Sequence, residues 1–338
     1  MDEEKPFVSV VVPMYNSEAT IESCLDSLIS MDYPGSRYEI IVVDDHSTDN
    51  SVKIIKNFTH VHDRIRLLRQ GKGKKGPAAA RNLGIRHAKG DFIASTDSDE
   101  IMFPDWLNEL LPYFSNSKIA AVGALLIEKH PLDSGLSTKI QSIIIDPADK
   151  PGKVAAGNVI YRKKIIEGAG LFNEFCVFND LDVDLHYRMQ EMGFKLVSVQ
   201  KYLGQHKQRH NLEAFYNRMK GFGAAGIIMA FFNSKKAFSD FENKKGIINY
   251  LALFSLLVLS MIFIASFLFT NPKISFFILI ACLIALTFYS CFNAALCFKR
   301  TKSSALLLPA VSFYIFIKMI AIVHGIFYGF FYYLKRKK

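Results

Sequence analysis

The sequence predicts an α/β domain with a mostly parallel sheet, followed by a membrane region. Strand-like and helix-like stretches alternate up to about residue 245, which is typical of β-α-β units. Apolar residues make up 50% of the 338 residues and concentrate after Asn249. We therefore expect an α/β domain over residues 1–210, an amphipathic linker over 211–245 and a membrane region over 246–338.

Four strands and three helices are predicted in the first part of the chain. Short runs rich in β-branched residues predict the strands, and apolar residues at helical spacing predict the helices. The strands are expected at 7–12, 39–43, 65–68 and 91–95, and the helices at 17–30, with Ser17 as its cap, 51–58 and 77–88. Later strand-like runs are Val159–Arg162 and Leu196–Val199.

Polar segments follow three of these strands. They are Pro13-Met14-Tyr15-Asn16, Asp44-Asp45 and Asp97-Ser98-Asp99. Parallel α/β sheets bind ligands beyond the carboxyl ends of their strands. The three segments are therefore expected to meet at one edge of the sheet and form a ligand site.

Two long apolar runs without any charge, 249–270 and 274–298, predict membrane-spanning helices. Each is long enough to cross about 30 Å of hydrocarbon at about 1.5 Å per residue. The basic segment 299–302 predicts a cytoplasmic loop, which places the α/β domain on the cytoplasmic side of a multi-pass cell-membrane protein.

The third apolar run, 305–334, is interrupted by Pro309 and Lys318 and ends in a basic tail. It is consistent with a third crossing or with a helix lying at the interface. Residues 211–232 predict an amphipathic helix, which either lies on the membrane or packs as an ordinary helix.

Charge and cysteine content exclude other classes of protein. The formal charge is +10, but no nucleic-acid-binding motif is present, so we expect no nucleic acid partner. The five cysteines form no CxxC pair, and three of them lie in apolar runs, which indicates small buried residues rather than disulfides or a zinc site.

The acidic segments indicate phosphate and metal chemistry. Asp97 and Asp99 follow a strand and can turn toward one divalent cation, Mg²⁺ or Mn²⁺, which prefers oxygen ligands. Of Asp44 and Asp45, one is expected to cap the helix that follows residues 47–49, and the other to accept hydrogen bonds from a base or ribose. The glycine- and lysine-rich segment 71–76 is not a P-loop and is interpreted as a basic loop.

These motifs, in this order, resemble the family 2 glycosyltransferases, whose GT-A fold is Rossmann-like. The segments that carry the resemblance are 8–16, 40–49, 79–84 and 97–99. The resemblance implies inverting transfer from a nucleotide sugar. It implies nucleotide binding by Pro13, Tyr15, Asn16, Asp45, Arg81 and Asp97, and metal binding by Asp97, Asp99 and His206. His46 stands where the family often has glycine.

The same resemblance points to Asp182 as the catalytic base. Residues 179–188 are similar to the family's Glu-Asp-x-Asp-Leu-x-x-Arg segment, with Leu181 in place of the glutamate and Asp180 as the alternative base. A carboxylate in this position would take the proton of the acceptor hydroxyl. Gly157 and Asn158 correspond to a segment that lies under the donor sugar in the family.

We therefore expect transfer from a UDP- or GDP-sugar to a lipid-linked saccharide or other glycan acceptor at the membrane lipid. A non-catalytic, nucleotide-sugar-binding membrane scaffold is the alternative. A nucleotidyltransferase would need a Gly- and Arg-containing loop after the first strand, where this chain has 13–16. A processive polymerase would need a Gln-x-x-Arg-Trp motif, and the sole tryptophan is Trp106.

Overall fold

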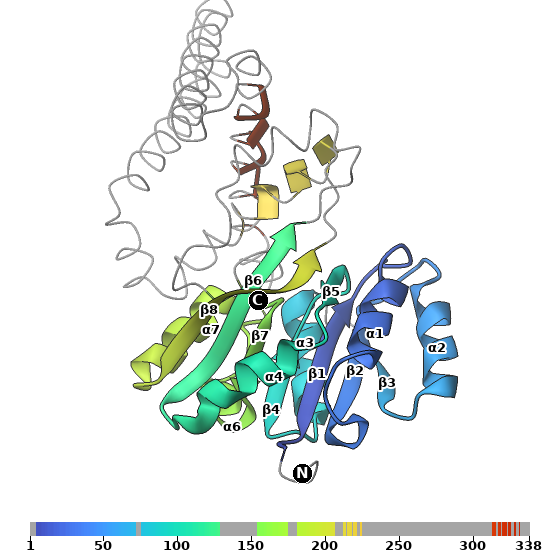
Figure 1. Ribbon diagram of the computed structural model, residues 1–338. Coiled ribbons are helices and arrows are strands. Elements are labelled where there is room, and N and C mark those ends of the chain that lie inside the picture. Colours follow the sequence, from blue (N-terminus) through green and yellow to red (C-terminus); the bar gives the residue numbers. More distant parts are fainter. Residues whose placement is uncertain are drawn as a thin grey trace, which may run out of the picture. The chain divides into compact units, whose positions relative to one another are not determined.

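The computed structural model describes residues 5–71, 76–128, 154–174 and 181–206, with scattered helical residues between 212 and 224 and between 313 and 331. The chain divides into two compact units (Figure 1). The first comprises Met1–Leu132 and Pro147–Gln208, and the second comprises Asp133–Asp146 and Arg209–Lys338. All predicted catalytic and ligand-binding residues lie in the first unit.

Four parallel strands form one half of the sheet in the first unit. β1 (Val8–Met14) lies between β2 (Tyr38–Asp44) and β4 (Phe92–Ser95), and β3 (Ile65–Arg69) pairs with β2. All residues of β1 and β2 are buried, as expected for central strands covered on both faces. The carboxyl ends of β1, β2 and β3 therefore lie side by side at one edge.

The other half of the sheet has mixed strand directions. β7 (Val159–Arg162) is antiparallel to both β4 and β6 (Ile119–Glu128), β6 is parallel to β8 (Lys195–His206), and β5 (Glu100–Met102) is antiparallel to β8. The order is β3-β2-β1-β4-β7-β6-β8-β5. The expectation of a mostly parallel sheet was therefore wrong for this half, because strand direction depends on distant pairing partners that a local pattern does not encode.

Helices cover both faces of the sheet. Their bounds are α1 (Ile21–Ile29), α2 (Ser51–Val61), α3 (Pro77–His87), α4 (Trp106–Leu110), α6 (Lys163–Gly168) and α7 (Leu181–Glu191), with short 3-10 turns at η2 (Gly35–Arg37) and η3 (Leu111–Ser115). Helices α1, α2 and α4 pack on the face that carries Val8, Val10 and Val12. Helix α3 packs on the opposite face, where a Cβ on Gly84 would come within 2.5 Å of Val11 Cγ1, so glycine is required there.

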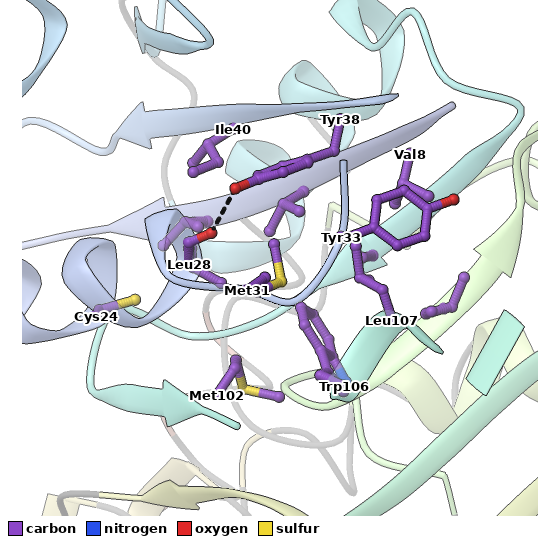
Figure 2. Close-up of a cluster of buried hydrophobic side chains, with 14 of the residues drawn as sticks. Val8, Cys24, Leu28, Met31, Tyr33, Tyr38, Ile40, Met102, Trp106 and Leu107 are labelled. Atoms are coloured by element: carbon purple, nitrogen blue, oxygen red, sulfur yellow. Dashed lines mark hydrogen bonds between the residues drawn. The ribbon is translucent and has the colours of Figure 1, made fainter. Parts of the chain in front are cut away.

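A cluster of buried hydrophobic side chains joins α1, α4 and the sheet (Figure 2). The hydroxyl of Tyr38 in β2 donates to the carbonyl oxygen of Leu28 in α1 at 3.0 Å. Trp106 in α4 is fully buried in the same cluster. This packing fixes α1 and α4 against the strands whose ends form the site.

Helix α1 begins at Ile21, and the expectation that Ser17 caps it was wrong. The carbonyl oxygen of Ser17 accepts the N–H groups of Thr20 and Ile21 in a preceding turn. Its hydroxyl lies 2.8 Å from that of Ser98, so Ser17 links the β1 edge to the Asp97–Asp99 segment.

In the second unit, described helical residues between 212 and 224 contact described helical residues between 313 and 331. The rings of Phe215 and Tyr314 lie 5.2 Å apart, and Tyr216 Oη lies 2.7 Å from His324 Nδ1. The predicted amphipathic helix thus packs, in part, against the third apolar run. Among the described residues, no helix has the length and apolarity needed to span a bilayer, and the runs 249–270 and 274–298 lie outside those residues.

Candidate active site

The loops after β1 and β2 are interlocked. Asn16 and His46 have φ angles of 48° and 64°, in the left-handed region that favours glycine. The Asn16 N–H donates to Ser47 Oγ at 3.0 Å, and the Thr48 N–H donates to Asn16 Oδ1 at 2.8 Å. Asn16 therefore holds the two loops together, and its predicted contact with the nucleotide stays a prediction.

Pro13 and Tyr15 lie at the end of β1 but differ in exposure. Pro13 is buried inside the strand, opposite Val43. Tyr15, just beyond the strand, is 60% exposed. Pro13 and Tyr15 were both predicted to bind nucleotide, but of these two only Tyr15 exposes a ring on which a base can stack.

The two adjacent acids after β2 have different roles. Asp44 Oδ1 accepts the N–H of Ser47 at 2.9 Å, so Asp44 closes the turn after β2, and the expectation that one of the two acids caps the helix beginning at Ser51 was wrong. Asp45 Oδ2 accepts the N–H of Gly76 at 2.7 Å, directly before α3. Asp45 is therefore fixed at the edge of the sheet, at the start of a helix, as its predicted role requires.

Asp97 lies in a closed turn after β4. Its N–H donates to Glu100 Oε2 at 2.9 Å, and the Thr96 hydroxyl donates to the same oxygen at 2.8 Å. Glu100 is 3% exposed. Burial and then the charge of Asp97 raise the pKa of Glu100 from 4.5 to about 8, against the lowering effect of His206. Glu100 therefore shapes the segment that presents Asp97 and Asp99.

Arg81 in α3 is buried against this turn. Its Nε donates to Ser95 Oγ at 3.1 Å, and its Nη2 pairs with Asp97 Oδ1. The Arg81 side chain is 3% exposed, whereas that of Asp97 is 39% exposed. Arg81 thus orients Asp97, and its predicted contact with the nucleotide stays a prediction.

Asp99 and His206 lie together although they are far apart in sequence. The pairing of β5 with β8 places Glu100 opposite His206. His206 Nε2 lies 3.4 Å from Asp99 Oδ2. Burial would lower the pKa of His206, but its hydrogen bond to Asp99 and the negative charges of Glu100 and Asp97 raise it to about 9. Two of the three predicted metal ligands, Asp99 and His206, therefore lie together, but the described residues contain no group of three ligands that could hold a metal ion.

Asp182 is the second residue of α7 and faces the segment before β7. Its Oδ2 accepts the N–H of Ala156 at 3.2 Å. The next residue, Gly157, lies against the Asp97 turn, because a Cβ there would be 2.2 Å from Glu100 Oε1 and 3.0 Å from Asp97 Oδ2. The predicted base and the predicted nucleotide and metal ligand Asp97 thus flank two adjacent residues.

Buried polar contacts hold α7 in this position. Asp184 Oδ2 accepts Arg188 Nη2 at 2.8 Å, and Arg188 Nη2 also donates to the carbonyl oxygen of Leu171 at 2.7 Å. The Tyr161 hydroxyl lies 2.8 Å from His186 Nε2. Burial, with the charge of Asp182, raises the pKa of Tyr161 well above 10, while Arg81 opposes this shift. The charges of Asp182 and Arg81 therefore both act on the buried hydroxyl of Tyr161.

Glu100 was not among the residues predicted from the sequence, and Gly157 was predicted only to lie under the donor sugar. Glu100 follows Asp99 directly, but a polar side chain gives no local sign that it will be buried. The alternative base Asp180 and residues 72–75 of the basic loop lie outside the described residues.

Residues 9–162 match the family model described as glycosyl transferase family 2. This segment contains β1 to β7, with Asp45, Arg81, Asp97 and Asp99. The matched residues end before α7 and β8, so Asp182 and His206 lie beyond them.

Two curated relatives match this chain over more residues than the family model does. The chain is 28% identical over 208 residues to Glycosyltransferase AglE of Haloferax volcanii, covering 60% of this chain and 68% of that protein. It is 25% identical over 241 residues to a dolichyl N-acetyl-alpha-D-glucosaminyl phosphate 3-beta-D-2,3-diacetamido-2,3-dideoxy-beta-D-glucuronosyltransferase of Methanococcus voltae, covering 66% and 74%.

A solved structure shares the fold. It is the mannosyltransferase PcManGT from Pyrobaculum calidifontis in complex with GDP-Man and Mn²⁺. The TM-score is 0.62 at 20% identity, covering 96% of this chain and 87% of that chain. At this identity the likeness shows the fold alone.

Proposed function

We propose that this chain is an inverting glycosyltransferase. It transfers a sugar from a UDP- or GDP-sugar to a hydroxyl of a membrane-associated acceptor, and a lipid-linked saccharide is the best candidate. The match of residues 9–162 to the glycosyl transferase family 2 model supports glycosyl transfer as the reaction class. One geometric observation supports the assignment of the residues.

That observation is the position of residues 156 and 157 between two carboxylates. Asp182 Oδ2 lies 3.2 Å from the nitrogen of Ala156, and the Cβ position of Gly157 lies 3.0 Å from Asp97 Oδ2. With ordinary backbone dimensions, the two carboxylates are at most roughly 12 Å apart. Both carboxylates are therefore close enough to act on one donor sugar, with the acceptor hydroxyl at Asp182 and the diphosphate at Asp97.

In the proposed mechanism, Asp182 accepts the proton of the acceptor hydroxyl as the oxygen attacks the anomeric carbon. The bond to the diphosphate breaks on the opposite side of that carbon, so the configuration inverts. Asp182 can do this because an ionised carboxylate only accepts hydrogen bonds, and the Ala156 N–H fixes its orientation.

The residues at the Asp97 turn fit a divalent cation, Mn²⁺ or Mg²⁺. Asp97 and Asp99 offer half-exposed carboxylate oxygens, and His206 adds a ring nitrogen beside Asp99. The described residues contain no ready group of three or more ligands, so donor phosphates would complete the coordination. When bound, the cation would neutralise charge that develops on the departing diphosphate.

The apolar sequence that follows the matched residues 9–162 supports a membrane-associated acceptor. The uncharged runs 249–270 and 274–298 are long enough to anchor the chain, and the basic residues after them favour a cytoplasmic catalytic domain. The Methanococcus relative acts, by its name, on a dolichyl phosphate-linked sugar. An anchored enzyme would meet a lipid-linked acceptor at high local concentration.

Transfer assays on the purified full chain test this function. They would combine UDP- and GDP-sugars, Mn²⁺ and either extracted membrane lipids or water-soluble saccharides. We expect transfer to a lipid fraction. Asp182→Asn should lower transfer by about 10²- to 10⁴-fold and leave nucleotide binding intact, whereas Asp63→Asn, at an exposed turn before β3, should change neither.

Two outcomes would contradict the proposal at different levels. Full transfer by Asp182→Asn would exclude this residue as the base. Nucleotide binding without hydrolysis or transfer for any donor would favour the non-catalytic scaffold.

A further inference from the structure

Gln70 is a buried amide without a partner. It follows β3 and is 4% exposed. Among the residues that the structure describes, neither its Nε2 nor its Oε1 has a hydrogen-bond partner. Such a group destabilises the folded state because it gives up hydrogen bonds to water and gains none. Buried polar groups are nearly always paired, so we look for the partner of Gln70 beyond the described residues.

The backbone places Gln70 beside Asp45. The Gln70 N–H donates to the carbonyl oxygen of Asp44 at 3.0 Å, and the Asp45 N–H donates to that of Met14 at 2.8 Å. Both bonds extend the sheet by one residue. Since Asp44 pairs with Arg69, Asp45 and Gln70 are the next cross-strand neighbours, and adjacent strands lie about 4.8 Å apart.

Both residues lie on the α3 face of the sheet. Side chains two residues apart in a strand share a face, so Asp45 lies on the face of Val43. By the same alternation Gln70 lies on the face of Leu68. Helix α3 packs on this face, since a Cβ on Gly84 would lie 3.3 Å from Val43 Cγ2. The contact of Asp45 with Gly76 places the pair at the N-terminal end of α3.

The two side chains have complementary chemistry. An ionised carboxylate only accepts hydrogen bonds, whereas an amide NH₂ donates them. An acceptor beside a donor matches a ring N–H beside a carbonyl group. Uracil and guanine present this edge. Cytosine and adenine present a ring nitrogen acceptor beside an amino group instead.

We propose that Gln70 determines base specificity, with its amide donating to the base carbonyl while Asp45 accepts the ring N–H. The inference rests on the proposed function, because the base belongs to the nucleotide sugar. It deepens that function by naming the residue that selects uracil or guanine over cytosine and adenine. The unpaired amide is then satisfied only in the nucleotide complex.

Binding of four nucleoside diphosphates to the full chain tests this proposal. With Mn²⁺, wild type should bind UDP or GDP about tenfold or more tightly than CDP and ADP, since each such contact is worth about a factor of ten or more. Gln70→Glu lacks the donor and should lose that preference.

Gln70→Leu separates recognition from folding. Without nucleotide it should melt at or above the wild-type temperature, because the unpaired amide is gone, yet it should bind UDP or GDP about tenfold more weakly. Gln200→Glu, at an exposed glutamine of β8, is the matched control and should leave binding unchanged.

The failures can be told apart. Wild type that binds none of the four nucleotides overturns the proposed function, and the base assignment with it. Wild type that binds all four equally, or variants of Gln70 that keep the wild-type ranking, overturn only the base assignment.

Discussion

Trp106 Nε1 donates a hydrogen bond to Asn158 Oδ1 at 2.7 Å, and both side chains are fully buried. Asn158 Nδ2 also donates to the carbonyl oxygen of Leu125 at 3.1 Å. Asn158 directly follows Ala156 and Gly157, which separate the Asp182 and Asp97 carboxylates. The core cluster of Figure 2 therefore anchors the backbone on which the proposed site is assembled.

Replacing Trp106 by Phe should affect both stability and transfer. The change leaves Asn158 Oδ1 buried without its donor and opens a small cavity, so we expect a loss of about 2 kcal/mol or more in the free energy of unfolding. A shift of residues 156–158 should also lower kcat. Urea unfolding and transfer assays measure the two effects.

Tyr38→Phe is the matched control, because it removes a buried hydroxyl that donates to the carbonyl oxygens of Leu28 and Ile29, remote from the site. It should cost about 1 kcal/mol of stability and leave kcat unchanged. An equal loss of kcat in both variants would show that activity simply follows stability.

Replacing Gly157 by Ala should disturb the site directly. The new Cβ would lie 2.2 Å from Glu100 Oε1, closer than any real contact, so carboxylates or backbone must move. We expect transfer to fall by about 10- to 100-fold, as misplacement near 1 Å can cost this much. Gly168→Ala, whose Cβ would meet only Met192 at 3.6 Å, should retain wild-type transfer.

Replacing Arg81 by Lys should weaken transfer although the charge is kept. A single ammonium group cannot reproduce the fork that contacts both Ser95 and Asp97. We expect about a tenfold or larger loss of kcat/KM. Arg86→Lys, at a half-exposed ion pair with Glu174, should behave as wild type, and equal losses would argue against an orienting role for Arg81.

Glu100 should make stability depend on pH. Its pKa is about 8 in the folded chain and 4.5 as the ordinary value, so the folded state holds one more proton between these values. The contribution of Glu100 to stability therefore falls as pH rises from about 4.5 to 8, and the full penalty remains above 8. The glutamine in Glu100→Gln does not titrate, so this variant does not lose that stability as pH rises.

Thermal unfolding at pH 5, 7 and 9 with a chelator measures this effect. The melting temperature of Glu100→Gln minus that of wild type should increase with pH. A difference that stays constant from pH 5 to pH 9 would contradict the assigned burial and charge environment of Glu100.

The parallel half of the fold was predictable from local patterns. The runs that became β1 and β2 are dense in Val and Ile, and the run that became β3 contains Ile65, Leu67 and Leu68, so each was visible as a strand. β7 was visible as a strand, but its antiparallel direction is not. That direction follows from pairing with β4, more than sixty residues earlier, and no local residue pattern carries this information.

The exposed and half-buried acids of the site were predictable from the sequence, but its buried polar residues were not. Asp45, Asp97 and Asp182 follow strand ends or begin a helix, positions that the alternation of elements identifies. Glu100 and Gln70 are polar and would be read as exposed from the sequence. Their burial results from Gly157 and from the ends of β2 and β3, which only the folded chain brings next to them.

The pairing of β5 with β8 has a consequence for how the protein is made. Glu100 and Asp99 are synthesised about a hundred residues before His206, their neighbour across the sheet. Until residue 162 has left the ribosome, β4 has an open edge, and such edges invite pairing with other chains. In the nascent chain, Asp99 and Glu100 therefore lack their β8 neighbour until residue 206 has been synthesised. The chain is most in need of protection from pairing with other chains during this interval of translation.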